Sequence, residues 1–378
     1  MQDSWIEAFD AGEITAVMTL DMSAAFDLVN HDILLRKLEI YGIEADTVGW
    51  LECYLSNRSQ RVYVDGELSS DLPVTVGVPQ GSILGPLLYI IFTNDLPESI
   101  HQHDEINSER SVNHNIDCRT CGNICCYADD ATYSISGTDG CELSRKLEVK
   151  YEEVATYMTN NRLVQNSDKT HLLVMCSSHK HRRFNNFGIT LNTGSEIIEP
   201  RETETLLGAQ LSNNFTWNHH IRDGEFSMFK VLVSKNNALR KKAKICNFKT
   251  RKMVATGMIM SNISYIIQVY GGCSDYLIST LQIQQNTAAR LVARLPRLTP
   301  TKIILQQCGW LSVRQMILYH SLLLLHKTIK GKKPSYIYSR LKTTRRETRH
   351  TDINSLVDER RLKTTTAMRS FIPRSIED

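Results

Sequence analysis

The sequence lacks the long apolar stretches that membrane proteins require. No apolar run approaches the roughly 18–20 residues that a spanning helix needs, and the runs at residues 83–92 and 322–325 have the length of core segments. The first residues are acidic and polar, unlike a secretory signal peptide. We therefore expect an intracellular protein of the nucleus or cytoplasm, neither secreted nor bound to a membrane, whose 10 cysteines are reduced.

Acidic residues are scarce in the second part of the chain. Residues 228–378 contain 28 Lys and Arg but only 7 Asp and Glu, whereas residues 1–227 contain 16 and 34. The net charge of +3 therefore combines +21 on the second part with −18 on the first. Solvated helix faces account for most basic runs, but an excess of one sign exceeds what i,i+4 pairing explains. The excess of basic residues therefore indicates that the second part binds nucleic acid.

The apolar periodicity and the charge of the sequence change near residues 212–218. Before it, segments of strand character alternate with helical segments, including a helix predicted over residues 24–41. After it, helical spacing dominates and basic residues multiply. We expect an α/β region with a small antiparallel sheet backed by helices over residues 1–215, and an all-α basic region over 216–335. Residues 336–378 are basic and poor in large apolar residues, which predicts a partly disordered tail.

Three carboxylates carry the strongest chemical signal. Asp129 and Asp130 lie between two short apolar segments, a pattern typical of a β-hairpin with the acids at its tip. Asp21 ends another apolar strand, residues 14–20. Carboxylates that converge on strand ends form a site for hard cations such as Mg²⁺. A pair of such ions is one means of driving in-line phosphoryl transfer.

The order of the motifs resembles that of the reverse transcriptases of non-LTR retrotransposons of the jockey and CR1 type. The resemblance covers residues 10–345 and rests on residues 20–27 (LDMSAAFD), 77–82 (GVPQGS), 84–86 (LGP), 127–130 (YADD), 166–170 (NSDKT) and 207–208 (LG). It implies a polymerase palm followed by a thumb. It also implies an RNA-directed DNA polymerase that extends a DNA primer on an RNA template with deoxynucleoside triphosphates.

The resemblance implies a catalytic role for four residues. Asp21, Asp129 and Asp130 would hold two Mg²⁺ ions, and the backbone carbonyl of Met22 would be a further ligand. Lys169 would protonate the leaving pyrophosphate. As a lone lysine beside an aspartate, it could equally be a surface charge.

A second group of residues would bind the nucleotide. Phe26 would stack under the incoming sugar and exclude a 2′-hydroxyl, which argues against an RNA-making polymerase. The alternative is a core aromatic on an amphipathic helix. Gln80, Gly81 and Tyr127 would line the pocket around the nascent base pair.

The resemblance also assigns residues to the template and primer. Leu207 and Gly208 would form the primer grip, a tight hairpin. The basic residues of the thumb, Arg240, Lys241, Lys242 and Lys244, would contact the phosphate backbone without reading its sequence.

The chain departs from the family in length. Only about 20 residues precede Asp21, so we expect a palm and thumb fragment without fingers or an upstream endonuclease, parts that another polypeptide of the same element could supply. The alternative to an active polymerase is a catalytically inactive, truncated remnant that only binds nucleic acid.

A second departure is a Cys- and His-rich insertion at residues 98–123. Cys118 and Cys121 have the two-residue gap of a zinc knuckle, and His114 and Cys125 could complete a tetrahedral structural Zn²⁺ site. The alternative is a flexible insertion with free thiols.

Overall fold

The computed structural model describes residues 1–105, 122–177, 188–339, 341–348 and 351–357. The chain folds into two compact units. The first unit contains Met1, Ile14–Val174 and Arg182–Arg201, and the second contains Gln2–Glu13, Met175–His181 and Glu202–Asp378. Among the described residues, no helix combines the length and the apolar character that crossing a bilayer requires.

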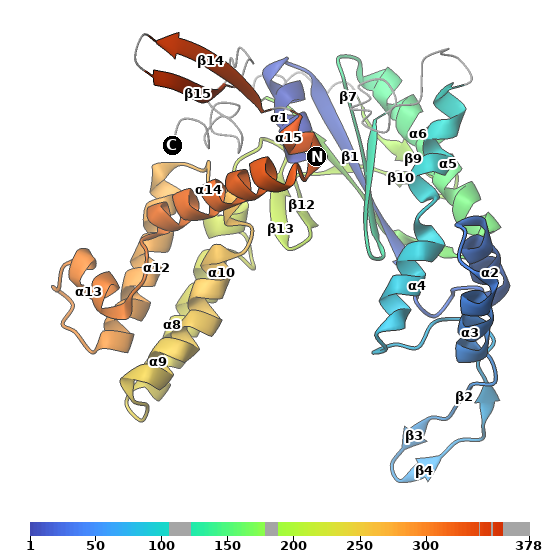
Figure 1. The fold of residues 1–378 in the computed structure, drawn as a ribbon, viewed down its shortest axis with the longest axis horizontal. Helices are drawn as coiled ribbons and strands as arrows, with labels where there is room; N and C mark the ends of the chain where they lie inside the picture. Colours follow the sequence, from blue (N-terminus) through green and yellow to red (C-terminus); the bar gives the residue numbers. More distant parts are fainter. Residues whose placement is uncertain (106–121, 178–187, 340, 349–350, 358–378) are drawn as a thin grey trace. The chain divides into compact units, whose positions relative to one another are not determined.

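A five-stranded sheet forms the centre of the first unit (Figure 1). Its strand order is β11–β8–β1–β7–β6. The strands are β1 (Ile14–Ser23), β6 (Asn123–Tyr127), β7 (Asp130–Gly137), β8 (Val164–Met175) and β11 (Pro200–Arg201). Residues Ile14 to Met18 are all at most 1% exposed, so both faces of the central strand are covered. This explains why β1 is a continuous apolar run rather than an alternating one.

The sheet is mixed, so the prediction of an antiparallel sheet is wrong at one edge. Strands β1 and β6 both pair antiparallel with β7, but β11 pairs parallel with β8. A parallel pair needs a crossover connection of a dozen or more residues, and residues 176–199 provide it. That segment carries a small two-stranded sheet of β9 (Leu191–Asn192) and β10 (Ile197–Ile198).

Helices complete the first unit. They are α2 (His31–Ile40), α3 (Ala45–Leu55), α4 (Leu84–Thr93), α5 (Leu96–Glu105) and α6 (Gly140–Asn160). The helix predicted over residues 24–41 begins seven residues late, because Ala24 adopts a left-handed φ of 48° and the Asn30 side chain caps the backbone N–H of Ile33. Residues 24–30 instead form the loop that carries Phe26 and Asp27.

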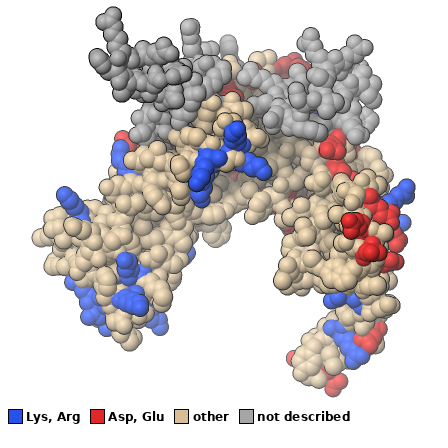
Figure 2. Space-filling view, in the orientation of Figure 1, with Lys and Arg blue, Asp and Glu red and all other residues tan. Residues whose placement is uncertain are grey.

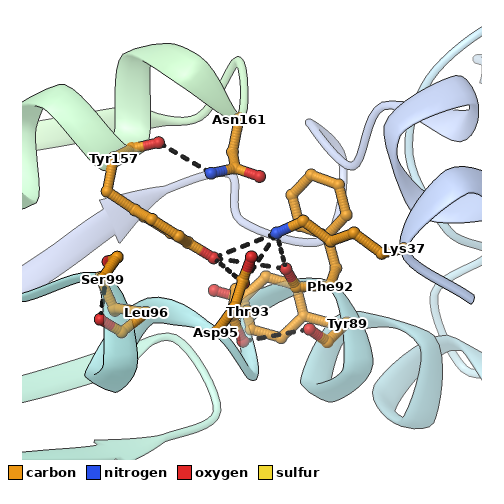
Figure 3. A network of polar contacts seen from close by, with 9 residues as sticks. All are labelled: Lys37, Tyr89, Phe92, Thr93, Asp95, Leu96, Ser99, Tyr157 and Asn161. Carbon is orange, nitrogen blue, oxygen red and sulfur yellow. Dashed lines mark hydrogen bonds and ion pairs between the residues drawn. The ribbon is translucent and has the colours of Figure 1, made fainter. Parts of the chain in front are cut away.

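A partly buried ion pair connects three of these helices (Figure 3). Lys37 Nζ on α2 donates to the Phe92 carbonyl at 2.7 Å and to Asp95 Oδ1 at 2.8 Å. The Tyr157 hydroxyl of α6 donates to the same Asp95 oxygen at 2.6 Å. Burial raises the pKa of Tyr157, and burial lowers the pKa of Lys37 although Asp95 opposes that shift. The network fixes α2 and α6 to the junction between α4 and α5.

An exposed arm extends from the first unit between α3 and α4. It consists of β2 (Ser59–Gln60), β3 (Tyr63–Val64), β4 (Glu67–Leu68) and β5 (Leu72–Pro73), paired β2 with β5 and β3 with β4. A turn at Asp65 and Gly66 joins β3 to β4. Tyr63 and Leu68 are 69% and 60% exposed, so the arm has little core of its own.

The second unit is largely helical. Its larger elements are α1 (Gln2–Asp10), α8 (Met228–Ala243), α9 (Phe248–Ala255), α12 (Asp275–Ala293), α13 (Thr301–Cys308) and α14 (Val313–Gly331). The shorter ones are η1 (His219–Asp223), η2 (Thr256–Met260), α10 (Ser261–Ser264), α11 (Ile267–Tyr270) and α15 (Ser335–Tyr338). One apolar cluster, which includes Leu232, Leu281 and Tyr270, forms the core of the helices from η1 to α14. The elements described between residues 216 and 335 are thus helical, as predicted.

Two hairpins accompany these helices. Strands β12 (Thr203–Leu206) and β13 (Ala209–Ser212) pair antiparallel, and so do β14 (Lys342–Thr348) and β15 (Thr351–Val357). The second hairpin gives regular structure to part of the segment predicted as a partly disordered tail. Residues 358–378 of that tail lie outside the described residues.

Candidate active site

The hairpin of β6 and β7 places Asp129 and Asp130 as the sequence predicts, with one refinement. Tyr127 pairs with Asp130, so the loop consists of Ala128 and Asp129, and Asp130 is the first residue of β7. Ala128 has a φ of 53°, the sign that two-residue hairpin loops require at this position. A residue other than glycine in this conformation is strained, and such strain is concentrated at functional sites.

The sheet brings Asp21 to the same place. Strand β1 continues to Ser23, two residues beyond Asp21, and its pairing with β7 sets Asp21 directly opposite Asp130. Burial raises the pKa of Asp130, and so do the negative charges of Asp129 and Asp21. The three carboxylates therefore repel one another, and a cation bound among them would relieve that repulsion.

Lys169 is the nearby cation in this structure. It lies on β8, the neighbour of β1 in the sheet, and its Nζ is 3.0 Å from Asp21 Oδ2. The hydrogen bond and the charge of Asp21 raise the pKa of Lys169. The side chain is 63% exposed, so the ion pair adds little to stability, and Lys169 can exchange its partner readily.

A hollow of about 340 Å³ lies beside the carboxylates. Its lining includes six residues that the sequence predicts for the site, namely Asp21, Met22, Phe26, Gln80, Asp129 and Lys169. It also includes Asp27 and Asn166, which the sequence reasoning did not assign. Asp130, Gly81 and Tyr127 are not part of this lining, and the Tyr127 side chain is 65% exposed.

The turn at residues 77–81 is attached directly to the loop after β1. The backbone N–H groups of Gly77 and Val78 donate to the carbonyls of Val29 and Phe26, each at 2.8 Å. A β-carbon at Gly77 would lie 2.8 Å from the Asp27 carbonyl oxygen, and its φ is +89°. Only glycine fits this close approach. This attachment brings Phe26 and Gln80 to the lining of the same hollow.

Asp27 is a residue that sequence reasoning missed. The side-chain amide of Gln80 donates to Asp27 Oδ1 at 2.8 Å and to Oδ2 at 3.0 Å. This contact joins residues 53 positions apart, and it fixes the orientation of the Gln80 amide. The available signal was the position of Asp27 in the motif at residues 20–27, beside Phe26.

Tyr89 is the second residue that sequence reasoning missed. It comes from α4, is fully buried, and its ring centroid lies 4.7 Å from that of Phe26. Its hydroxyl donates to Met22 Sδ at 2.9 Å. Burial raises the pKa of Tyr89, and the negative charges of Asp129 and Asp21 add to the shift. Tyr89 therefore contacts both residues, Met22 through its hydroxyl and Phe26 through its ring.

The donor set fits Mg²⁺ in its chemistry, because it consists of carboxylates, the hard oxygen ligands that Mg²⁺ prefers. In the part of the chain that the structure describes, no group of three or more His, Cys, Asp or Glu side chains is gathered closely enough to hold a metal. Asp21 is paired with Lys169 instead.

The predicted zinc site falls mostly outside the described residues. His114, Cys118 and Cys121 lie in the segment 106–121. Cys125 is described, and it is exposed on β6.

The residues predicted for the primer and template lie in the second unit. Leu207 and Gly208 form the two-residue loop between β12 and β13, and both have positive φ, 48° and 77°, as a tight hairpin requires. The predicted hairpin is thus present, and its role as a primer grip stays a prediction. Arg240, Lys241, Lys242 and Lys244 are exposed at the end of α8, and basic side chains gather on the unit's surface in Figure 2.

Comparisons with known proteins agree with the motifs. The chain is 27% identical over 303 residues to the probable RNA-directed DNA polymerase from transposon BS of Drosophila melanogaster, and the match covers 77% of this chain and 30% of that protein. It is 24% identical over 292 residues to the RNA-directed DNA polymerase from mobile element jockey of the same fly, with coverages of 77% and 30%. The predicted resemblance to jockey-type elements is confirmed, and the chain spans about 30% of the length of these relatives.

A solved structure of telomerase from Candida tropicalis, in complex with a TWJ fragment of telomeric RNA, matches over 89% of this chain and 46% of its own. It is 11% identical with a TM-score of 0.43, too low to support an inference. The family model described as reverse transcriptase (RNA-dependent DNA polymerase) matches residues 4–192, half of the chain. This chain therefore belongs to the reverse transcriptase family.

Proposed function

We propose that this chain carries the nucleotidyl-transfer centre of an RNA-directed DNA polymerase of a non-LTR retrotransposon. It would extend a DNA primer on an RNA template with deoxynucleoside triphosphates. The observation that carries the proposal is the pairing of Asp21 with Asp130 across β1 and β7, with Asp129 beside them at the hollow. Family membership and the names of the relatives support it.

The carboxylates are the groups that would hold two Mg²⁺ ions in the active enzyme. Bound there, the ions would supply positive charge for the attacking hydroxyl and for the triphosphate. Asp21 and Asp130 come from the adjoining strands β1 and β7, and Asp129 comes from the loop before β7, so the sheet fixes two of the three ligands. Such a rigid base suits a site that must position charge in advance of the reaction.

Lys169 would act as the acid. Its pKa is raised beside Asp21, so the amine stays protonated at neutral pH and can give a proton to a leaving pyrophosphate. Its exposure at the rim of the carboxylates leaves it able to turn from Asp21 to a bound triphosphate. The alternative role of a plain surface charge is less consistent with this position.

Phe26 and Gln80 would select the nucleotide. The Phe26 ring rests on buried Tyr89, so an incoming sugar that stacks on it would meet a surface that cannot yield to a 2′-hydroxyl. Gln80, oriented by Asp27, would contact the nascent base pair. These features favour deoxynucleotides over ribonucleotides, and thus a DNA-making enzyme.

The organisation of the chain fits the same proposal. Residues 1–215 would be the palm, residues 216–335 the thumb with its adjoining helices, and residues 336–378 a basic tail. The exposed basic side chains at the end of α8 would contact the phosphates of the template–primer duplex.

Primer extension by the purified chain tests the proposal. The substrate is a DNA primer annealed to an RNA template, with Mg²⁺ and deoxynucleotides, and the control is the double variant Asp129→Ala/Asp130→Ala. Extension by the parent chain that is lost in the control supports the polymerase. Absence of extension, with salt-sensitive binding of template–primer by both proteins, would instead support the alternative of an inactive remnant that only binds nucleic acid.

A further inference from the structure

A second pocket, of about 490 Å³, lies wholly within the second unit. It is bordered by the loop between β12 and β13, by η1, and by the starts of α8 and α10. Its walls include Gly208, Gln210, His220, Phe226, Val231 and Tyr265. Apart from Gly208, none of these residues entered the sequence reasoning, and none belongs to the carboxylate site.

His220 lines this pocket and has a buried hydrogen-bond donor without a partner among the described residues. Its side chain is 7% exposed, and burial lowers its pKa, so the ring is neutral at physiological pH. Nδ1 accepts a hydrogen bond from the backbone N–H of Gln210 at 3.3 Å, which puts the proton of the neutral ring on Nε2. That Nε2 has no hydrogen-bond partner among the described residues. Buried donors without partners are rare in folded proteins and call for an explanation.

Gln210 supplies a matching acceptor. Its side-chain Oε1 is buried and likewise has no hydrogen-bond partner in the part of the chain that the structure describes. The amide lies against Gly224, where any β-carbon would collide with that oxygen. The absence of a side chain at residue 224 thus leaves the space that the Gln210 amide occupies. Both side chains line the pocket, and each carries a buried polar atom that lacks a hydrogen-bond partner among the described residues.

Two aromatic rings complete the pocket at its open side. Phe226 is 76% exposed and Tyr265 is 52% exposed. The Tyr265 hydroxyl donates to the Leu207 carbonyl at 2.7 Å, and its ring lies close against Gly208, so this ring is held in place. Exposed aromatic rings beside a polar recess are the means by which proteins stack unpaired bases.

We propose that this pocket binds a single unpaired nucleobase of a nucleic acid strand. The face of the base would stack on Phe226, beside Tyr265. Its edge would accept from His220 Nε2 and donate to Gln210 Oε1 once these two side chains, enclosed in this structure, turn toward the pocket. Every base carries both a donor and an acceptor on its edge, so the pocket would accept any base that is free of a partner. The phosphates would lie near Lys230 and the further basic residues of α8, which begins just after Phe226.

The inference rests on the proposed function for the source of its ligand, which is the strand that the polymerase would handle. A single-stranded RNA oligonucleotide with one 2-aminopurine, moved through successive positions, is the probe. We expect the full chain to quench the fluorescence of 2-aminopurine on binding, because stacking on an aromatic ring quenches it. Phe226→Ala should abolish the quench and weaken binding about tenfold, whereas Phe226→Tyr, which keeps the ring, should retain both.

His220→Phe tests the polar part of the pocket. It keeps an aromatic ring against Trp217 and Tyr270 but removes the donor, and we expect weaker binding with the quench retained. Should this buried substitution prevent folding, the exposed Phe226 variants still decide the question. An unchanged affinity and an unchanged quench in Phe226→Ala would overturn the inference, as would a quench at no position of the oligonucleotide.

The two proposals fail separately. The Asp129→Ala/Asp130→Ala protein, altered only in the first unit, should quench 2-aminopurine as the parent chain does. Primer extension without a quench that depends on Phe226 would refute the base pocket and support the polymerase. A quench that depends on Phe226, without any primer extension, would support the base pocket and refute the polymerase.

Discussion

Gln80 donates hydrogen bonds to both carboxylate oxygens of Asp27, at 2.8 and 3.0 Å. Asp27→Ala should release the Gln80 amide and raise the KM for deoxynucleotides about tenfold, since a hydrogen bond to a charged group contributes about 1.5–3 kcal/mol. Steady-state kinetics of single-nucleotide extension measure this. Glu67→Ala, in the exposed arm, is the matched control. An unchanged KM in Asp27→Ala would show that Gln80 is positioned without Asp27.

Phe26 and Tyr89 should act together in sugar selection, because their ring centroids are 4.7 Å apart. Phe26→Ala should raise the incorporation of ribonucleotides relative to deoxynucleotides by at least about tenfold, the selectivity that about 1.4 kcal/mol supplies. Tyr89→Phe keeps the ring and should leave the ratio near that of the parent. The ratio of kcat/KM for the two nucleotide types checks both variants. An unaltered ratio in Phe26→Ala would refute the role of Phe26 in excluding a 2′-hydroxyl.

The ion pair of Lys37 and Asp95 should be important for folding rather than for catalysis. Asp95→Ala leaves the Lys37 ammonium, which is 12% exposed, without its charge partner, and we expect a loss of about 2–3 kcal/mol in the free energy of unfolding. Tyr157→Phe should cost about 1 kcal/mol. Urea denaturation followed by circular dichroism measures both. Glu98→Ala, in the helix that follows Asp95, serves as control, and an equal loss there would contradict this role.

The basic end of α8 should determine the salt dependence of binding. Lys241→Ala/Lys242→Ala should weaken template–primer binding and reduce the slope of log K against log salt by about 0.9 for each phosphate that the protein no longer neutralises. Fluorescence anisotropy over a range of salt concentrations gives the slope. Lys146→Ala, on a surface helix of the first unit and paired with Glu142, is the control. A slope identical to that of the parent chain would show that the end of α8 does not contact the template–primer duplex.

His220 should make the second unit sensitive to mild acid. Its pKa is lowered by burial, so the unfolded chain takes up a proton at a higher pH than the folded chain. Stability linked to His220 is therefore complete above its unfolded pKa of about 6.5 and is lost as pH falls through the lowered folded value. Urea titrations at about pH 7.5 and about pH 5.5, on either side of that unfolded value, should show a smaller loss in His220→Phe than in the parent chain. Equal losses would mean that other groups cause the acid sensitivity.

The sequence alone was sufficient to predict the parts of the site that depend on local pattern. Asp129 and Asp130 lie at the tip of a β-hairpin, as predicted, because this feature is set by residues that are near one another in the chain. The loop at Leu207 and Gly208 is of the same kind.

Contacts between distant residues were not predictable in this way. The Asp27–Gln80 and Phe26–Tyr89 contacts depend on how the loop after β1 packs against α4 and its preceding turn, and no periodicity encodes that. The parallel edge strand β11 was missed because two residues carry no strand signal. The helix predicted from residue 24 begins at His31, because a left-handed Ala24 and the Asn30 cap overrode an apolar spacing that fits a helix.

The exposed arm of β2 to β5 affects how the folded chain responds to a protease. Its short strands bury little apolar surface, so opening it locally costs far less than unfolding the first unit. Arg58 and Arg61 lie beside β2, within reach of trypsin in such an opened state. A cut there would separate the strand that carries Asp21 from the turn that carries Gln80 in the covalent chain, while the sheet, the Lys37 network and the hydrogen bonds from Gly77 and Val78 would still hold the two pieces together.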